Sequence, residues 1–250
     1  MHSQYYINNQ RYSAFLESQD IASYSKYMRW LKPPAGKNFL DIGCGIGKVV
    51  DVLCQEGFEG YGVDISKSSI EKARSDRLGK YLWLNSKALP FSDNFFDSVG
   101  AFTVLEHVED PRGFIREMAR VTKKGGRLVL VCPNFLSLTN SYHWHTRGIL
   151  RKVKNFSISL KKGFCFSFAP YRLHFDMMEP RIKQHIEPDD DAIIVTNPMD
   201  VLNELRKFRI GRIYYSSMVY DCGEGMFQKV RDLPLLKYFF GGIFFVGIKE

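Results

Sequence analysis

The sequence lacks the patterns that define several large classes of protein. It contains five cysteines but no C-x-x-C pair, so we expect reduced thiols, no metal site and no disulfide framework. The cysteines are Cys44, Cys54, Cys132, Cys165 and Cys222. The most apolar stretch, Tyr238–Ile248, is shorter than the roughly 20 residues that a helix needs to cross a bilayer. The first residues show no basic segment followed by an apolar run, so we expect no signal peptide and a cytoplasmic protein.

Acidic residues are also missing from one long segment. Between Met118 and Phe175 there is no Asp or Glu, and the formal net charge of the whole chain at pH 7 is +8. The basic residues of this segment are Arg120, Lys123, Lys124, Arg127, Arg147, Arg151, Lys152, Lys154, Lys161, Lys162 and Arg172. Such a segment either binds an anionic partner or forms a solvated face that aids solubility, and the sequence leaves both interpretations open.

Short apolar runs alternate with helical patterns over residues 38–133, as is typical of βαβ units around a parallel sheet. The expected strands are Asn38–Ile42, Gly60–Asp64, Tyr81–Asn85, Ser98–Thr103, Gly126–Cys132, Ala192–Thr196, Ile210–Val219 and Gly242–Ile248. The expected helices are Ser13–Leu31, Lys48–Gln55, Lys67–Leu78, Pro111–Val121 and Pro198–Phe208. The helix at Pro111 has Asp110 as its expected N-cap.

Residues 134–190 have no clean period and are rich in aromatic and basic residues, so we interpret them as a partly helical insertion. We expect a single domain over residues 1–250, because one α/β domain commonly reaches this length. Its parts are an N-terminal helical segment (1–37), a ligand-binding core (38–133), the insertion as a substrate cap (134–190) and the C-terminal half of the sheet (191–250). The expected fold is α/β, a Rossmann-like, doubly wound, seven-stranded sheet, mostly parallel with an antiparallel C-terminal edge strand.

A glycine-rich run, Asp41–Gly47, stands where the first strand becomes a helix, the place where a doubly wound sheet binds a nucleotide. Lys48 occupies the position of the last glycine of the dinucleotide fingerprint G-x-G-x-x-G, and this disfavours an NAD-dependent oxidoreductase. The carboxylate of Asp41 suits a cationic ligand and would repel a pyrophosphate. About twenty residues further on, Asp64 ends the second strand, where a carboxylate can accept both hydroxyls of an adenosine ribose.

Four ordered motifs together resemble the class I S-adenosylmethionine (SAM)-dependent methyltransferases. Asp41–Gly47 resembles motif I of that family. Leu89–Asp97, Val104–Pro111 and Arg120–Asn134 resemble later segments of the branch that includes ubiquinone and menaquinone biosynthesis methyltransferases. The resemblance covers residues 38–134, and the rest of the chain matches only in outline.

The resemblance implies SAM as cofactor and a set of residues around it. Gly43, Cys44, Gly45 and Gly47 would pass under the methionine and ribose, with Asp41 near the sulfonium. Asp64 would hold the ribose and Ile65 would pack on the adenine. Asn85 and Ser86 stand where many relatives have Asp-Ala beside the adenine amino group, and Asn can still accept a hydrogen bond there. Backbone groups near Phe102 and Thr103 would meet the methionine amino and carboxylate groups.

Methyl transfer from a sulfonium requires chiefly that the acceptor be oriented and water excluded, so the catalytic residues are unknown from sequence. Three histidines are candidates for a base. His107 lies in a Glu-His pair that can equally brace its loop. His143 and His145 begin the insertion, where they could act as a base or bind a metal, with a plain surface role as the alternative. Some quinone-pathway relatives use a metal at acid-histidine positions.

The insertion is expected to select the acceptor, because aromatic residues lie among its bases. They are Tyr142, Trp144, Phe164, Phe166, Phe168 and Tyr171. This mixture suits a phosphorylated or lipid-linked acceptor near an anionic membrane surface, and nucleic acid less well. We expect a methyltransferase that acts on a small-molecule, saccharide or lipid-linked acceptor. The alternatives are a core internal to the insertion, a non-catalytic SAM-binding or regulatory protein, and an RNA or protein methyltransferase.

Overall fold

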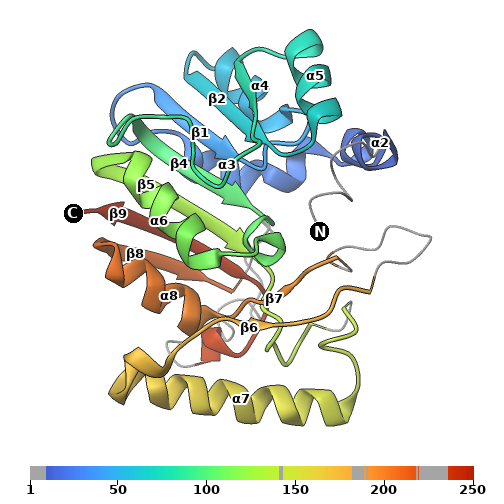
Figure 1. The fold of residues 1–250 in the computed structure, drawn as a ribbon, viewed down its shortest axis with the longest axis vertical. Helices are drawn as coiled ribbons and strands as arrows, with labels where there is room; N and C mark the ends of the chain where they lie inside the picture. Colours follow the sequence, from blue (N-terminus) through green and yellow to red (C-terminus); the bar gives the residue numbers. More distant parts are fainter. Residues whose placement is uncertain (1–9, 141–142, 182–188, 190, 218, 220–235) are drawn as a thin grey trace.

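A computed structural model describes residues 10–140, 143–181, 189, 191–217, 219 and 236–250. Its centre is one seven-stranded sheet with the strand order β3-β2-β1-β4-β5-β9-β8 (Figure 1). The strands are β1 (Asn38–Ile42), β2 (Glu59–Asp64), β3 (Lys80–Trp83), β4 (Phe96–Phe102), β5 (Thr122–Cys132), β8 (Ile210–Ser216) and β9 (Ile243–Lys249). The expected Rossmann-like fold and the expected number of sheet strands are confirmed.

The C-terminal strand β9 is antiparallel to both of its neighbours, β5 and β8, while the pairs from β3 through β5 are parallel. The antiparallel strand that we expected from the sequence is therefore present. It lies one place inside the edge, because β8 pairs with its outer side. The strand order reverses between the neighbours β1 and β4. We call the region at the carboxyl ends of these two strands the crevice, because doubly wound sheets bind their ligands there.

Successive side chains along each strand point alternately into two separate hydrophobic cores. In β5, Leu128 and Leu130 pack into one core, which also holds buried residues of α6 (Pro111–Val121) and α8 (Pro198–Lys207). Val129 and Val131 pack into the other core, with α3, α4 and α5. Those helices are α3 (Ser25–Leu31), α4 (Lys48–Gln55) and α5 (Lys67–Asp76). Helices thus cover both faces of the sheet, and the alternation along each strand determines which core receives each side chain.

The prediction of a single helix over Ser13–Leu31 is wrong. The structure has α2 (Gln10–Ser18), a 3₁₀ turn (Ile21–Tyr24) and α3. The break occurs at Asp20, whose side chain accepts a hydrogen bond from the backbone N–H of Ala22 at 3.0 Å. That carboxylate begins a new helical segment instead of continuing the old one, and the chain changes direction there.

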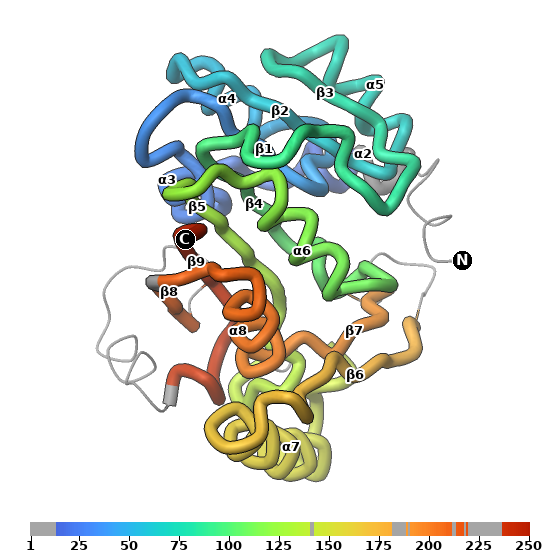
Figure 2. The backbone as a smooth tube through the Cα atoms, turned by 60° about the vertical axis from the view of Figure 1, so that its left-hand side comes forward, coloured from blue at the N-terminus to red at the C-terminus, as the bar shows by residue number. Residues whose placement is uncertain are grey.

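The insertion contains one long helix, α7 (Ile149–Phe168), a 3₁₀ turn (Pro170–Arg172) and the short strand β6 (Asp176–Met177). β6 pairs with β7 (Ile194–Val195) in a separate two-stranded sheet. The strand expected at Ala192–Thr196 therefore forms outside the main sheet, because its partner comes from the insertion. Figure 2 shows α7 at the outer end of the molecule, beyond this small sheet. None of the helices in the described ranges combines the length and the apolarity that a bilayer crossing requires.

Candidate functional site

The glycine-rich loop joins β1 to α4. The backbone N–H groups of Gly43 and Cys44 both donate to the carbonyl oxygen of Val63, at 2.8 and 3.1 Å, which ties the loop to β2. Gly43 has φ +73°, and a Cβ added there would collide with the side chain of Val104. Only glycine combines this conformation with this lack of space. Gly43 is exposed, whereas Gly45 and Gly47 are buried.

Asp64 lies at the carboxyl end of β2, directly beside the loop. Its Oδ2 accepts the backbone N–H of Gly45 at 2.8 Å, and its Oδ1 accepts that of Ser66 at 2.7 Å. Burial raises the pKa of Asp64, and these backbone hydrogen bonds act in the opposite direction. An ionised carboxylate has about four acceptor positions, so capacity remains for two hydroxyl groups of a ligand.

Asp41 is the second buried carboxyl group of the crevice. The hydroxyl of Tyr27 donates to its Oδ1 at 2.6 Å. Burial raises the pKa of Asp41 to about 7, the Tyr27 hydrogen bond opposes this, and the nearby Asp64 adds to it. Sequence reasoning missed Tyr27, because α3 brings it to the end of β1 only in the folded chain. A group that titrates near neutral pH beside a crevice is typical of a functional site.

The N-terminal helix α2 lies against the glycine-rich loop, which the sequence did not reveal. A Cβ added to Gly45 would lie 2.6 Å from Cδ1 of Leu16. The ammonium of Lys48 donates to the carbonyl oxygens of Glu17 and Gln19, at 2.6 and 2.8 Å. Lys48, the residue that departs from the dinucleotide fingerprint, therefore fastens the end of α2 to the start of α4.

The neighbouring edge carries the residues expected near an adenine. Ile65 is 36% exposed, and the indole N–H of Trp83 donates to its carbonyl oxygen at 3.0 Å. Asn85 and Ser86 are exposed on the loop that follows β3. Trp83, itself partly exposed, is an apolar surface that sequence reasoning missed, although its place at the end of the third strand was a usable signal.

Phe102 is the last residue of β4, and Thr103 follows it directly. The ring of Phe102 lies 5.0 Å from that of Tyr24 and 5.3 Å from that of Tyr27. The N–H of Thr103 donates to the carbonyl oxygen of Val131 at 2.8 Å, and Thr103 has a φ of +52°. Since this N–H is already bonded, the carbonyl groups are the better candidates for binding a ligand ammonium.

His107 lies in a cluster with three acids. Its Nε2 is 3.7 Å from Oε1 of the fully buried Glu106, and its Nδ1 is 3.2 Å from Oδ2 of Asp191. Burial and the charge of Asp189 raise the pKa of Glu106, and burial raises the pKa of Asp191 to about 6. Glu106, His107 and Asp189 offer atoms within 4.8 Å of one another, which could hold a metal ion. The expectation of no metal stays a prediction.

His143 and His145 lie in the chain before α7. His143 is 1% exposed, and its ring centroid is 4.7 Å from that of Phe135. The N–H of His145 donates to Nδ1 of His143 at 3.2 Å, and burial lowers the pKa of His145. These contacts suit a packing role. Tyr142, expected beside them in an acceptor pocket, lies outside the described residues.

Comparisons with known proteins match the part of the chain that contains the glycine-rich loop and the strands around it. Residues 40–130 match the family model of the methyltransferase domain. An O-methyltransferase from Aspergillus sclerotiorum is 35% identical, over 42% of this chain and 45% of the relative. The ubiquinone biosynthesis O-methyltransferase from Alkalilimnicola ehrlichii is 34% identical, over 40% and 42% respectively. The 2-methyl-6-phytyl-1,4-hydroquinone methyltransferase from Synechocystis is 35% identical, over 39% and 32%. Each match spans less than half of the relative.

Solved structures match over a longer range but at lower identity. A SAM-dependent methyltransferase from Mesorhizobium loti superposes with a TM-score of 0.59 at 16% identity, covering 92% of this chain and 99% of that one. The fold is thus that of a doubly wound α/β protein, in which ligands bind at the switch in strand order. Residues 40–130 match a methyltransferase domain, and the fold is shared with SAM-dependent methyltransferases.

Proposed function

We propose that this chain transfers a methyl group from SAM to a small-molecule acceptor. The observation that carries the proposal is the pair of buried carboxyl groups, Asp41 and Asp64, on either side of a glycine-rich loop that leaves no room for side chains. A cationic adenosine ligand fits this arrangement, whereas a pyrophosphate would meet two acids.

Each residue has a role that follows from its position. Asp64 accepts the ribose hydroxyls through the lone pairs that Gly45 and Ser66 do not use. Asp41 interacts with the positively charged methionine end of the donor. Ile65 and Trp83 give apolar surface to the adenine. Cys44 and Gly47 shape the loop, while Asn85, Ser86, Phe102 and Thr103 border it.

Bound SAM supplies an already activated methyl group, so the chain's own task is to orient the acceptor and exclude water. α2 lies over one side of the loop, and the small β6-β7 sheet touches the turn that holds His107. His107 is the best candidate for accepting a proton from a hydroxyl acceptor, because Asp191 contacts its Nδ1 and can orient the ring.

The acceptor class rests on the relatives, two of which are named for ubiquinone biosynthesis and for a phytyl hydroquinone. We therefore propose an acceptor of this kind, a phenol or hydroquinone that carries an apolar chain. The exposed apolar residues of the insertion support a lipid-linked acceptor over a saccharide.

Calorimetric titration with SAM and with its demethylated product tests the donor site. Transfer of label from methyl-labelled SAM to a panel of phenols, hydroquinones, sugars, RNA and peptides then tests the reaction. Product on the phenols or hydroquinones is the expected result. Tight donor binding with no product on any acceptor would favour a non-catalytic SAM-binding protein, and product on RNA or peptide alone would overturn the acceptor class.

A further inference from the structure

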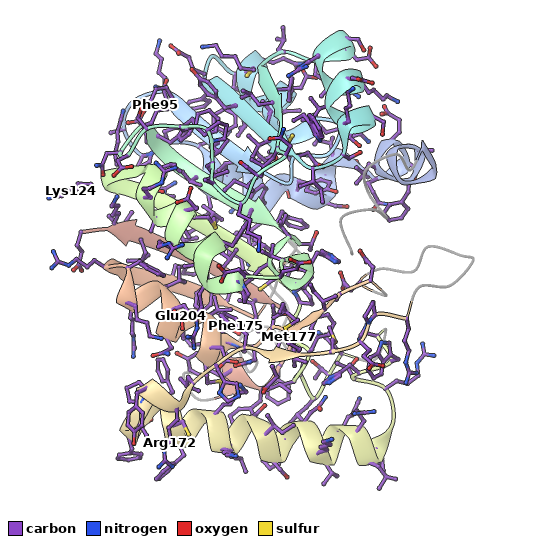
Figure 3. The ribbon with its side chains drawn as sticks, in the orientation of Figure 1. Phe95, Lys124, Arg172, Phe175, Met177 and Glu204 are labelled. Carbon is purple, nitrogen blue, oxygen red and sulfur yellow. The ribbon has the colours of Figure 1, made fainter. Side chains whose placement is uncertain are left out.

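Helix α7 forms the outer end of the molecule, and Figures 1 and 2 agree that nothing in the described chain lies beyond it. One of its faces contacts α8 and the turn at Pro170–Arg172. Figure 3 shows Arg172 at one end of this region and side chains that extend from the far side of α7, away from the sheet. α7 therefore has one packed face and one open face.

The packed face of α7 is polar. Its buried residues are Asn155, Ser159 and Lys162. The side-chain amide of Asn155 donates to the carbonyl oxygens of Phe135 and His145, both at 3.0 Å. A surface helix ordinarily turns its apolar face to the core. Here the fully buried positions are polar, and the partly buried Ile158 and Phe166 are the apolar residues that pack beside them.

Lys162 is the main charged anchor of this face. Its ammonium lies 2.7 Å from Oδ2 of Asp200 and 2.9 Å from Oδ2 of Asp176, and it donates to the carbonyl oxygen of His174 at 2.8 Å. The rotation of α7 about its own axis is thus determined by a buried ion pair. Ile158 and Phe166 pack inward against hydrophobic cores, while most other apolar residues of α7 point outward.

The open face carries an apolar stripe along the helix, in which Phe156 also lies with its ring 5.7 Å from that of Phe239. Its side chains are between 39% and 85% exposed. They are Ile149, Leu150, Val153, Phe156, Leu160, Phe164 and Phe168. Steps of three and four residues connect 149, 153, 156, 160, 164 and 168, which places them in one row at 3.6 residues per turn. A helix of this length extends for about 30 Å, so the stripe is long and continuous.

Basic residues border this stripe, and acidic residues are absent from it. Lys154 and Lys161 are exposed and two turns apart on one side, and Lys152 lies on the other. No Asp or Glu occurs anywhere between Met118 and Phe175. An apolar row between rows of lysine matches an interface of acyl chains and anionic headgroups.

We propose that the open face of α7 lies flat on an anionic lipid surface, with its apolar side chains in the headgroup boundary and its lysines at the lipid phosphates. A second copy of this chain fits less well, because two α7 stripes in contact would bring lysines against lysines. The proposal does not depend on methyl transfer, since lipid binding can be measured without a donor.

Flotation of the full chain with vesicles tests the proposal directly. We expect binding to vesicles of phosphatidylcholine with about one third phosphatidylglycerol, and much weaker binding to phosphatidylcholine alone. Added salt is expected to weaken the binding, because the Debye length falls to about 3 Å at 1 M. No binding to either vesicle at low salt would overturn the proposal, and a concentration-dependent dimer that ignores vesicles would point to a second copy instead.

Two sets of variants separate the stripe from its charges. The triple change Lys152→Glu, Lys154→Glu and Lys161→Glu is expected to lower the partition coefficient at least about tenfold. Lys37→Glu, Arg116→Glu and Lys124→Glu alter the net charge equally at exposed positions elsewhere and form the matched control. If this control loses as much binding as the α7 variant, the net charge of the protein alone attracts it to the vesicles, and the proposal fails.

The triple change Val153→Ser, Leu160→Ser and Phe164→Ser removes apolar side chains and keeps every charge. We expect a loss of vesicle binding of at least about tenfold, because three exposed apolar side chains would no longer enter the lipid interface. Unchanged binding would show that α7 does not insert. Thermal melting and SAM titration of each variant report folding and the donor site, so a failure of the methyltransferase assignment would be visible separately.

Discussion

The core of residues 38–133 and the insertion use buried charge in opposite ways. In the core, Asp41 and Asp64 lie at the crevice, and burial raises the pKa of each. In the insertion, Lys162 is paired directly with Asp200 and Asp176. We propose that the acids of the core bind the donor, and their burial has a cost in stability. The charges of the insertion hold α7 in place. Removing each kind should therefore have different consequences for folding and for SAM binding.

The largest effect is expected at Lys162. Lys162→Ala leaves Asp200 buried without its ammonium partner, and we expect the free energy of unfolding to fall by about 3–5 kcal/mol. Lys161→Ala, the exposed neighbour, should change it by less than about 0.5 kcal/mol. Urea unfolding measures both. A small loss for Lys162→Ala would mean that the ion pair does not anchor α7.

Asp64 tests the other side of the comparison. Asp64→Ala is expected to weaken SAM binding by about 1–3 kcal/mol, because charge-assisted hydrogen bonds to the ribose are lost. Asp76→Ala, an exposed position with the same change in charge, should leave the affinity unaltered. Gly45→Val should weaken SAM binding more, since its side chain would meet Leu16 and the ligand path. Calorimetry that finds equal affinities for wild type and Asp64→Ala would contradict the ribose assignment.

The pKa of Asp41 predicts how donor binding depends on pH. Below pH 7 the carboxyl group is largely protonated, and a cationic donor requires the ionised form. SAM affinity should therefore rise from pH 6 to 8, by up to about tenfold per unit below 7, and then level off. Asp41→Asn should lose this Asp41-dependent rise. If SAM affinity still rises with pH in Asp41→Asn, the positive charge of the donor does not interact with Asp41.

The same shift has a consequence for the protein without donor. The folded-state pKa of Asp41 is raised, so the stability contribution of its protonated form is complete below about pH 4 and is lost as pH rises through 7. At pH 8 Asp41→Asn should raise the free energy of unfolding by up to a few kcal/mol, at about 1.4 kcal/mol per pKa unit. Thermal melting of the wild type and of Asp41→Asn at pH 5 and pH 8 measures this difference. A variant that is less stable than the wild type at pH 8 would contradict the prediction.

The smallest effect is expected on the open face of α7. Leu160→Ala should change the free energy of unfolding by less than about 0.5 kcal/mol, because Leu160 is half exposed. Leu128→Ala, in the core beneath α6, should cost about 2–5 kcal/mol. Urea unfolding compares the two. A large loss at Leu160 would show that the stripe is covered in the folded protein and would weaken the case for lipid.

The sequence predicted an element correctly where the residues that determine it are neighbours in the chain. Asp110 caps α6, with Pro111 as its first residue, as expected from their types. β1 has the expected bounds because an apolar run stands directly before the glycine loop. The second half was harder. β7 was expected at the right place, but its partner β6 is two residues long and leaves almost no periodic signal.

The sequence by itself determined the parallel core, the glycine-rich loop, and the two acids that end β1 and β2, because each depends on residue types within a few positions. Only the tertiary structure decided what meets across long separations. Tyr27 reaches Asp41, Asp191 reaches His107, and Lys162 of α7 reaches Asp200 while the apolar stripe of α7 faces outward. The period of a helix says which side chains share a face, but the contacts of that face decide which way it points.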